Sequence, residues 1–431
     1  MEGAFLAVSH FDRVSVVLGC MLVVGALVAG LARRSFLSLT AVFVLGGFAL
    51  GKGGLDLVSF DPRSGFVATL AVVALIVILF RDGLEVEAEM LQKAWHLPFR
   101  KLALAMPITA GLVTCATKVL TDLSWSESFL VGALLSPTDP VLSSAVVTNP
   151  RVPRVIRHSL NLESGLNDGL ALPAVLALIA ANRIGGGHFD WLKFVLQDVV
   201  IGLATGVVVG FLAARLMPLR RALGAEISAH QKSLYALGVA FAAYGLAVEE
   251  PHGNGLISAF VAAITLGILR PDIRAAFETR SEDIVELVKL GIFVVFGAVL
   301  TIDGLFQDGL AAAAIAAFTL VVARPVAVFA ALARTRTDMA TRAFMAWFGP
   351  KGVSTMTFAL LVLADRVAAG SRIFHIAALT VLFSIVAHGV TDTAGAEWMG
   401  RRARRAEAEA DAEAAGSVDR GARSFARSPT T

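Results

Sequence analysis

The sequence predicts an all-α polytopic membrane protein with about thirteen spanning helices, and two observations lead to this fold class. Hydrophobic residues make up 56% of the 431 residues, charged residues make up only 16%, and the mean hydropathy is +0.74. A soluble domain carries roughly 25% charged residues. When the chain is divided at its charged or Pro/Gly-rich joints, the apolar pieces also approach the roughly 20 residues that a helix needs to cross a bilayer. The lipid bilayer is therefore the first expected partner.

The expected spans follow one another along the chain, and each ends where charged residues, proline or glycine begin. The first is long enough to span, and no cleavable signal peptide pattern is evident before it. Spans five, six and twelve differ from the others because polar or helix-breaking residues interrupt them. The spans cover residues 14–32, 36–52, 65–81, 99–119, 126–148, 160–182, 192–214, 233–250, 253–270, 284–302, 309–333, 340–364 and 373–394.

Lysine and arginine are concentrated in alternate joints between these spans, whereas each intervening joint holds at most two. Because cytoplasmic loops carry an excess of basic residues, the alternation predicts a multi-pass protein of the plasma (inner) membrane with its N-terminus outside and its C-terminus in the cytoplasm. The basic joints contain Arg33 and Arg34; Lys93, Arg100 and Lys101; Arg151, Arg154 and Arg157; Arg215, Arg220, Arg221 and Lys232; Arg270, Arg274 and Arg280; Arg334, Arg336 and Arg342; and Arg401, Arg402, Arg404 and Arg405.

Composition also argues against several other classes of protein. The net charge of +3 is small and dispersed between apolar segments, so we expect no nucleic-acid partner. Cys20 and Cys115 lie in apolar segments and suit neither a disulfide framework nor a zinc cluster. Residues 399–431 are polar and low in complexity, which predicts a cytoplasmic tail after a membrane domain of residues 1–398.

The sixth span contains the run NLESGLNDG, which places two acids and an amide inside an apolar segment. At about 100° per residue, Glu163, Ser164, Asn167 and Asp168 fall on one half of the helix. A charge at the centre of a spanning helix costs approximately 2.5 to 3.5 kcal/mol, which makes an ion pathway or a proton relay the default interpretation. The alternative is a polar cluster that only bonds neighbouring helices.

The fifth span carries SPTDPVLSS, residues 136–144, in which Pro137 and Pro140 are expected to break the helix. Broken backbone at membrane depth is tolerated where it lines a cavity, and in transporters the freed carbonyls and half-helix ends bind ions. Asp139 and the carbonyl of Thr138 would offer hard oxygen ligands to a small monovalent cation or a proton. The alternative is a kink in which Asp139 caps the second half-helix, and the two roles are compatible.

The twelfth span is interrupted at WFGPKGVST, where Gly349, Pro350 and Gly352 surround Lys351. Broken helices five and twelve fall in two halves of the chain, as expected for inverted-repeat transporters whose discontinuous helices cross near the midplane. Lys351 and Asp139 would then offset the opposed dipole ends of the half-helices. A surface turn at GPKG is the alternative, and it would disturb the alternation of loop charge.

Arg324, in VVARPVAV of the eleventh span, is the remaining deep charge. Because an unpaired buried charge is costly, its expected partner is Glu163. This pairing would join the sixth and eleventh spans.

Six motifs in order carry a resemblance: FRDGLEVE, SPTDP, ESGLNDG, ARPVAV, GPKGVST and FSIVAHGVT. Over nearly all of residues 10–395 the chain resembles sodium/proton antiporters of the cation:proton antiporter-1 family, the prokaryotic relatives of sodium/hydrogen exchangers. The resemblance implies a homodimer with the inverted-repeat antiporter fold. It also implies a core domain, at about 99–182 and 309–394, built around crossed, unwound helices five and twelve, and an interface domain at about 14–81 and 192–302.

The resemblance assigns roles to the candidate residues. Asp139 and Asp168 match the acids of the site, where Asp168 would bind a monovalent cation and a proton alternately, and the Thr138 carbonyl and Ser164 hydroxyl match further cation ligands. Asn167 matches the residue that supports the site, and Glu163 and Arg324 match a structural ion pair. Some prokaryotic members use an acid directly after the Phe of FRDGL, where this chain has Arg81, so Asp82 is a candidate replacement.

The hypothesis that follows is a secondary transporter, not an enzyme, that exchanges one sodium or potassium ion for one proton. Burial disfavours a charged carboxylate, so Asp168 is expected to hold a proton until a cation replaces it, and either load neutralises the site for alternating access. The Asn-Asp pair is typical of electroneutral family members. The sequence contains no GxxxxGK[ST] motif, so we expect no cofactor and an ion gradient as the driving force.

The main alternative function is an ion channel or an organic-anion symporter on the same architecture. An intramembrane aspartyl protease would also need two acids on different helices, such as Asp139 and Asp168, but neither lies in the GxGD pattern of that class. The sequence leaves open the preferred cation, the activating pH, the role of the tail, and whether Asp82 replaces the acid missing at Arg81.

Overall fold

The computed structural model describes residues 39–63, 65–86, 96–139, 144–185, 189–217, 227–249 and 251–425, together with Gly19 and Val23. Throughout these residues the regular secondary structure is helical, apart from one isolated β-bridge between Arg183 and Val367. The predicted all-α class is therefore confirmed for the described chain. The first expected span, 14–32, falls outside the described residues except at Gly19 and Val23.

Six helical segments of the described chain are long and apolar enough to cross a bilayer. A seventh exists if α13 (Gly255–Leu269) and α14 (Pro271–Arg280), which meet at 115°, form one bent span. A polytopic membrane protein is thereby confirmed, whereas the count of thirteen spans stays a prediction. The six are Gly65–Leu84 (α3), His96–Leu120 (α5 to α6), Arg154–Ala181 (α9), Trp191–Leu216 (α10 to α11), Leu310–Ala331 (α17 to α18) and Gly370–Arg405 within α21.

Further helices, outside the six spanning segments, occupy most of the other expected spans. Three of them are apolar helices of ten to seventeen residues: α2 (Leu39–Leu50), α7 (Trp125–Leu135) and α20 (Val353–Ala364). The others are α8 (Ser144–Val147), α12 (Ala229–Glu249), α15 (Glu282–Val299), α16 (Ile302–Leu305) and α19 (Met339–Trp347).

The helix breaks expected in spans five and twelve are present in the structure. Helix α7 ends at Leu135, and residues 136–139 are not helical; Pro140 lies outside the described residues. Helix α19 ends at Trp347 and α20 begins at Val353, so residues 348–352 form a second non-helical segment. Proline and glycine account for both breaks, because proline lacks the donor that a helix needs and glycine adds backbone freedom.

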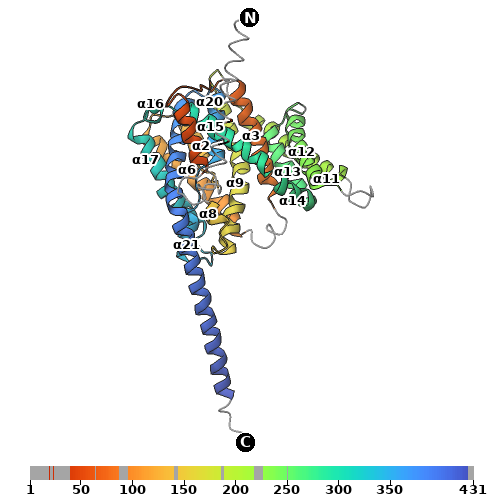
Figure 1. Ribbon diagram of the computed structural model, residues 1–431. Coiled ribbons are helices and arrows are strands. Elements are labelled where there is room, and N and C mark those ends of the chain that lie inside the picture. Colours follow the sequence, from red (N-terminus) through yellow and green to blue (C-terminus); the bar gives the residue numbers. More distant parts are fainter. Residues whose placement is uncertain are drawn as a thin grey trace.

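Two helical regions extend beyond the sequence prediction. The joint after Arg270 is itself helical, because Pro271 takes the first position of α14, where its missing N–H is not needed. Helix α21 (Gly370–Phe425) continues past the expected end of span thirteen into the tail, whose alanine, glutamate and arginine residues favour helix. Figure 1 shows α21 leaving the helical body as one long helix.

Phe260 on α13 holds the two helices that carry Asp82 and Asp168. The next residue in each case is a glycine that lies against Phe260. A Cβ on Gly83 would approach the Phe260 carbonyl oxygen to 2.7 Å, and a Cβ on Gly169 would overlap the Phe260 ring. These glycines allow α3 and α9 to approach α13 closely, and the close packing fixes the positions of both acids.

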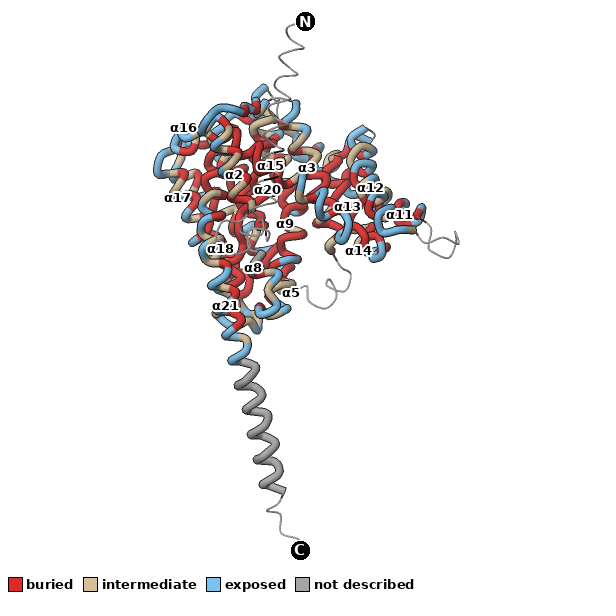
Figure 2. The backbone as a smooth tube through the Cα atoms, viewed as in Figure 1, coloured by how far each residue is buried: buried red, intermediate tan, exposed pale blue. Residues whose placement is uncertain are grey.

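Buried residues are concentrated in the helical body, around α3, α9, α15 and α20, as Figure 2 shows. Charged side chains are among them, although a buried charge is costly unless it is paired or hydrogen-bonded. They include Asp82, Lys101, Asp139, Glu163, Asp168, Lys289, Arg324 and Lys351. The partners of these buried charges therefore indicate which of them could form a functional site.

Candidate functional site

The two helix breaks are joined by a pair of opposite charges. The Lys351 ammonium donates to the carbonyls of Ser136 (3.1 Å) and Pro137 (2.8 Å), just beyond the C-terminal end of α7. In the other direction, Asp139 Oδ2 accepts the backbone N–H of Val353 at 2.8 Å, at the first residue of α20. A cation at a helix C-terminus and an anion at a helix N-terminus are both favourable. Each break thus supplies the charge that suits the helix end in the other.

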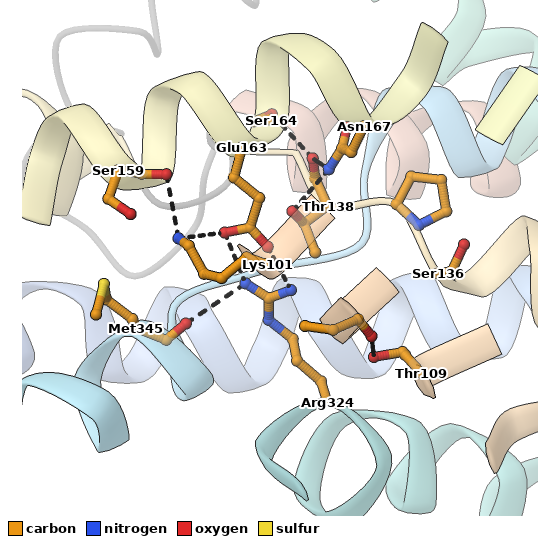
Figure 3. A network of polar contacts seen from close by, with 12 residues as sticks. Lys101, Thr109, Ser136, Thr138, Ser159, Glu163, Ser164, Asn167, Arg324 and Met345 are labelled. Atoms are coloured by element: carbon orange, nitrogen blue, oxygen red, sulfur yellow. Dashed lines mark hydrogen bonds and ion pairs between the residues drawn. The ribbon is translucent and has the colours of Figure 1, made fainter. Parts of the chain in front are cut away.

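The Thr138 carbonyl is held by two donors from α9, as Figure 3 shows. The Ser164 hydroxyl donates to it at 2.9 Å and the Asn167 side-chain amide at 2.8 Å. The same amide lies 2.9 Å from the Thr138 hydroxyl oxygen. Ser164 and Asn167 therefore attach the sixth expected span to the broken backbone of the fifth.

Asp168 is a buried carboxylate that is only partly hydrogen-bonded. It is 4% exposed, and its Oδ2 accepts a hydrogen bond from the Ser354 hydroxyl. Its Oδ1 is buried and has no hydrogen-bond partner among the described residues. Buried polar atoms in folded proteins nearly always have a partner, so an orphaned carboxylate oxygen marks a place where a proton or a cation would fit.

A cavity of about 580 Å³ is lined by Asp168 and by three other predicted site residues. Asp82, Asp139, Ser164 and Asp168 all line it, together with Ser354. The structure thus brings Asp82, the candidate replacement for the acid missing after Phe80, into the same cavity as the other acids. Asp82 also contacts Arg81, whose Nη1 lies 3.3 Å from its Oδ1.

The cavity is strongly acidic. Residues of α3, α9, α14, α15 and α20 line it, and its carboxylates outnumber its basic side chains, which are Arg81 and Lys289 with His158 beside them. A cleft lined by one sign of charge concentrates counter-ions, so this cavity favours cations over anions. Its carboxylates are Asp82, Glu85, Asp139, Asp168, Glu278, Glu282 and Glu286.

Glu163 forms a three-charge cluster with two cations, drawn in Figure 3. Arg324 Nη1 lies 3.1 Å from Oε1, in agreement with the expected pairing. Lys101 Nζ lies 2.6 Å from Oε2 and also donates to the Ser159 carbonyl at 3.1 Å. The cluster joins α9 to α18 (Arg324–Ala331) and to the π-helical segment η1 (Lys101–Ala105).

Sequence reasoning missed two of these residues. The sequence places Lys101 among the basic residues of a cytoplasmic joint, but it is 1% exposed and its ammonium contacts Glu163. Ser354 lies within GPKGVST, and the motif assigns it no role, although a hydroxyl directly after a helix break is a signal for a ligand or an orienting group. Both contacts depend on which helices meet, and a single sequence does not contain that information.

Comparison with protein families gives one match over most of the chain. The family model described as "Sodium/hydrogen exchanger, transmembrane" matches residues 21–396. Among curated proteins, the K(+)/H(+) antiporter NhaP of Alkalimonas amylolytica is 24% identical over 89% of this chain and 66% of its own length. The low-affinity Na(+)/H(+) antiporter NhaS1 of Synechocystis is 27% identical over 82% of this chain and 68% of its own. The chain thus spans about two thirds of the length of these relatives.

Solved structures show the same architecture. The sodium proton antiporter MjNhaP1 from Methanocaldococcus jannaschii at pH 8 superposes with a TM-score of 0.75 and 19% identity. The superposition covers 90% of this chain and 99% of that one. At this level of identity the likeness establishes a shared fold.

Proposed function

Because this chain belongs to the sodium/hydrogen exchanger family of transmembrane proteins, we propose that it is a secondary transporter that exchanges sodium or potassium ions for protons. One observation carries the proposal: Asp168 lines an acidic cavity, and its buried Oδ1 has no hydrogen-bond partner in the described chain. The curated relatives are potassium/proton and sodium/proton antiporters, which supports the same substrate class.

The proposed mechanism is competition of a proton and a cation for Asp168. An empty, charged carboxylate in a buried site is penalised, and either load neutralises it. The loaded site would then move between the two sides of the membrane by alternating access, while the empty site would be held back. Because the empty site does not cross, each cation that moves in one direction must be followed by a proton that moves in the other.

The proposed cation ligands are Asp168 and Asp139, the Ser164 hydroxyl oxygen and the Thr138 carbonyl. The contacts of Ser164 and Thr138 refine their expected roles. Ser164 donates its proton to Thr138, which leaves its own lone pairs free for a cation. The Thr138 carbonyl already accepts two hydrogen bonds, so it becomes a ligand only if Ser164 or Asn167 turns away.

Asp82 is proposed to assist rather than to bind. It lines the cavity, and Arg81 at 3.3 Å compensates part of its charge. We therefore assign it an electrostatic influence on Asp168. Glu163 with Arg324 is proposed as a structural cluster, because the Glu163 carboxylate pairs with Arg324 and Lys101 and all three residues lie outside the cavity lining.

We also propose the topology, domain organisation and assembly that the sequence predicts. They comprise thirteen spans with an outside N-terminus and a cytoplasmic C-terminus, crossed helices five and twelve, the core and interface domains, a homodimer, and a place in the plasma membrane. The reciprocal contacts of Lys351 and Asp139 support the crossing, since each break contacts a helix end of the other.

An organic-anion symporter fits the site less well, because the carboxylates of the cavity would repel an anionic substrate. Reconstitution into liposomes tests the proposal. Purified protein is exposed to gradients of sodium, potassium or lithium in turn while an internal dye reports pH, and protein-free liposomes serve as the control. We expect at least one cation gradient to drive proton movement in the opposite direction. Cation flux without proton movement would instead indicate a channel.

A further inference from the structure

Lys289 on α15 is a buried lysine whose ammonium has no hydrogen-bond or ion-pair partner among the described residues. It is 5% exposed and lines the acidic cavity. Within the described chain its ammonium makes no hydrogen bond and no ion pair. The other two lysines that are buried in the described part of the chain differ, because Lys101 contacts a carboxylate and a carbonyl and Lys351 contacts two carbonyls. A satisfied structural lysine would look like those two.

The charge of Lys289 acts on the acids of the site from a distance. Coulombic attraction links its ammonium to both Asp82 and Asp168, although neither forms an ion pair with it. The other charged groups around the cavity are Arg81, His158 and the remaining carboxylates named above. Lys289 is thus a positive charge that lines the same cavity as both acids.

We propose that Lys289 acts as a fixed competing charge that weakens cation binding at Asp168 and so sets the affinity of the transporter. Two other arrangements would serve transport less well than a lysine that lines the cavity without contacting Asp168. A lysine in direct contact with Asp168 would block the site, whereas its absence would leave several carboxylates attracting the cation. Transport requires binding that is favourable enough to load the site and weak enough to release the ion. The inference rests on the proposed function.

The same charge also weakens proton binding, because a proton and a monovalent cation at Asp168 experience nearly the same repulsion. Removing it should strengthen both affinities by a similar factor. At acid pH, where protons compete for the site, the two changes cancel and the KM for the cation stays the same. At alkaline pH, where protons no longer compete, KM approaches the intrinsic cation affinity and falls. A fixed charge therefore predicts that the KM values of the wild type and of a neutral variant agree at acid pH and differ at alkaline pH.

The experiment measures KM for the transported cation across a range of pH in everted vesicles. Neutral variants Lys289→Gln and Lys289→Met are compared with the wild type and with Lys289→Arg, which keeps the charge. We expect KM of the neutral variants to fall about tenfold at alkaline pH and to match the wild type at acid pH. Lys289→Arg should follow the wild type. Lys118→Gln, a change on α6 (Met106–Leu120) outside the cavity, is the matched control and should also follow it.

Each other outcome has a distinct meaning. An unchanged KM at alkaline pH in a folded neutral variant would overturn the proposal, and so would a KM that changes by the same factor at every pH. Failure of both neutral variants to fold would assign the ammonium a structural role and overturn it as well. If KM of the wild type does not rise as pH falls, the competition in the proposed function is wrong, and the alkaline comparison still decides the role of Lys289.

Discussion

Lys351 Nζ lies 2.8 Å from the carbonyl oxygen of Pro137, although the two residues are 214 positions apart in the chain. The contact joins the two helix breaks, and Lys351 is fully buried there. Carbonyls at the end of a helix have no partner within that helix, and at membrane depth no bulk water replaces one. The ammonium therefore completes α7 with a group that only the distant break can supply.

Replacing Lys351 by Met is expected to destabilise the protein. The change keeps the length of the side chain but removes the donor to both carbonyls, which should lower the free energy of unfolding by about 2 to 4 kcal/mol. Thermal unfolding in detergent measures it. Lys118→Met is the matched control, since Lys118 donates to a single carbonyl, that of Leu123, from a half-buried position. Equal losses in the two variants would refute a special role for Lys351.

The three-charge cluster predicts unequal effects for its members. Glu163→Gln leaves Lys101 and Arg324 buried without a counter-charge, and we expect a loss of about 3 to 5 kcal/mol in stability. Arg324→Met still leaves Lys101 paired with Glu163, so its loss should be smaller. Melting temperatures of both purified variants provide the comparison. A lower melting temperature for Arg324→Met than for Glu163→Gln would mean that the contact between Lys101 and Glu163 does not stabilise the fold.

The sequence indicates the features that arise within one helix. The polar half of α9 follows from helical spacing, and the breaks beside Pro137 and Pro350 follow from proline and glycine chemistry. The expected partner of Arg324 was also Glu163, because few deep charges were available. The helix face and the breaks can be predicted from a short stretch of chain. The ion pair can be predicted because a deep charge needs a partner and only one reasonable partner was available.

Features that depend on several helices meeting could not be obtained in this way. Lys101 borders a basic joint, and nothing in its neighbours along the chain shows that it turns inward. Lys289 and Ser354 become notable only when α15 and α20 are placed around the same cavity. Asp82 was identified from the family pattern, but its approach to Asp168 depends on the packing of both helices against Phe260.

Asp168→Asn is expected to abolish exchange while the protein stays folded. The amide keeps the size and a hydrogen-bond acceptor for Ser354, but it carries no charge and does not titrate. Cation-driven pH change in proteoliposomes measures the effect. Asp365→Asn is a suitable control, because Asp365 pairs with Arg183 at a half-exposed position outside the cavity. Transport by Asp168→Asn at the wild-type rate would show that the site is misassigned.

Asp82→Asn is expected to change affinity rather than to abolish transport. Asp82 adds negative charge to the cavity without belonging to the proposed ligand set, so its loss should raise the KM for the cation about fivefold and leave the maximal rate similar. Initial rates over a range of cation concentrations separate the two parameters. A complete loss of exchange in a folded variant would instead make Asp82 a member of the binding site.

Asn167 bears on the charge moved in each cycle. Its amide donates to both the carbonyl and the hydroxyl of Thr138, and a carboxylate at this position would lack those donors. An amide also carries no second proton at physiological pH. Asn167 therefore holds the broken backbone and leaves Asp168 as the titrating group of this pair.

Exchange of one proton for one monovalent cation at Asp168 should consequently move no net charge. We expect sodium-driven proton flux in proteoliposomes to stay the same when the membrane potential is clamped at different values with potassium and valinomycin. Asp139 Oδ2 accepts the N–H of Val353 at the start of α20, and in the proposed cycle Asp168 alone exchanges its proton. A flux that changes steeply with the clamped potential would mean that a second group releases or binds a proton during transport, and Asp82 would then be the first residue to neutralise in a repeat of the measurement.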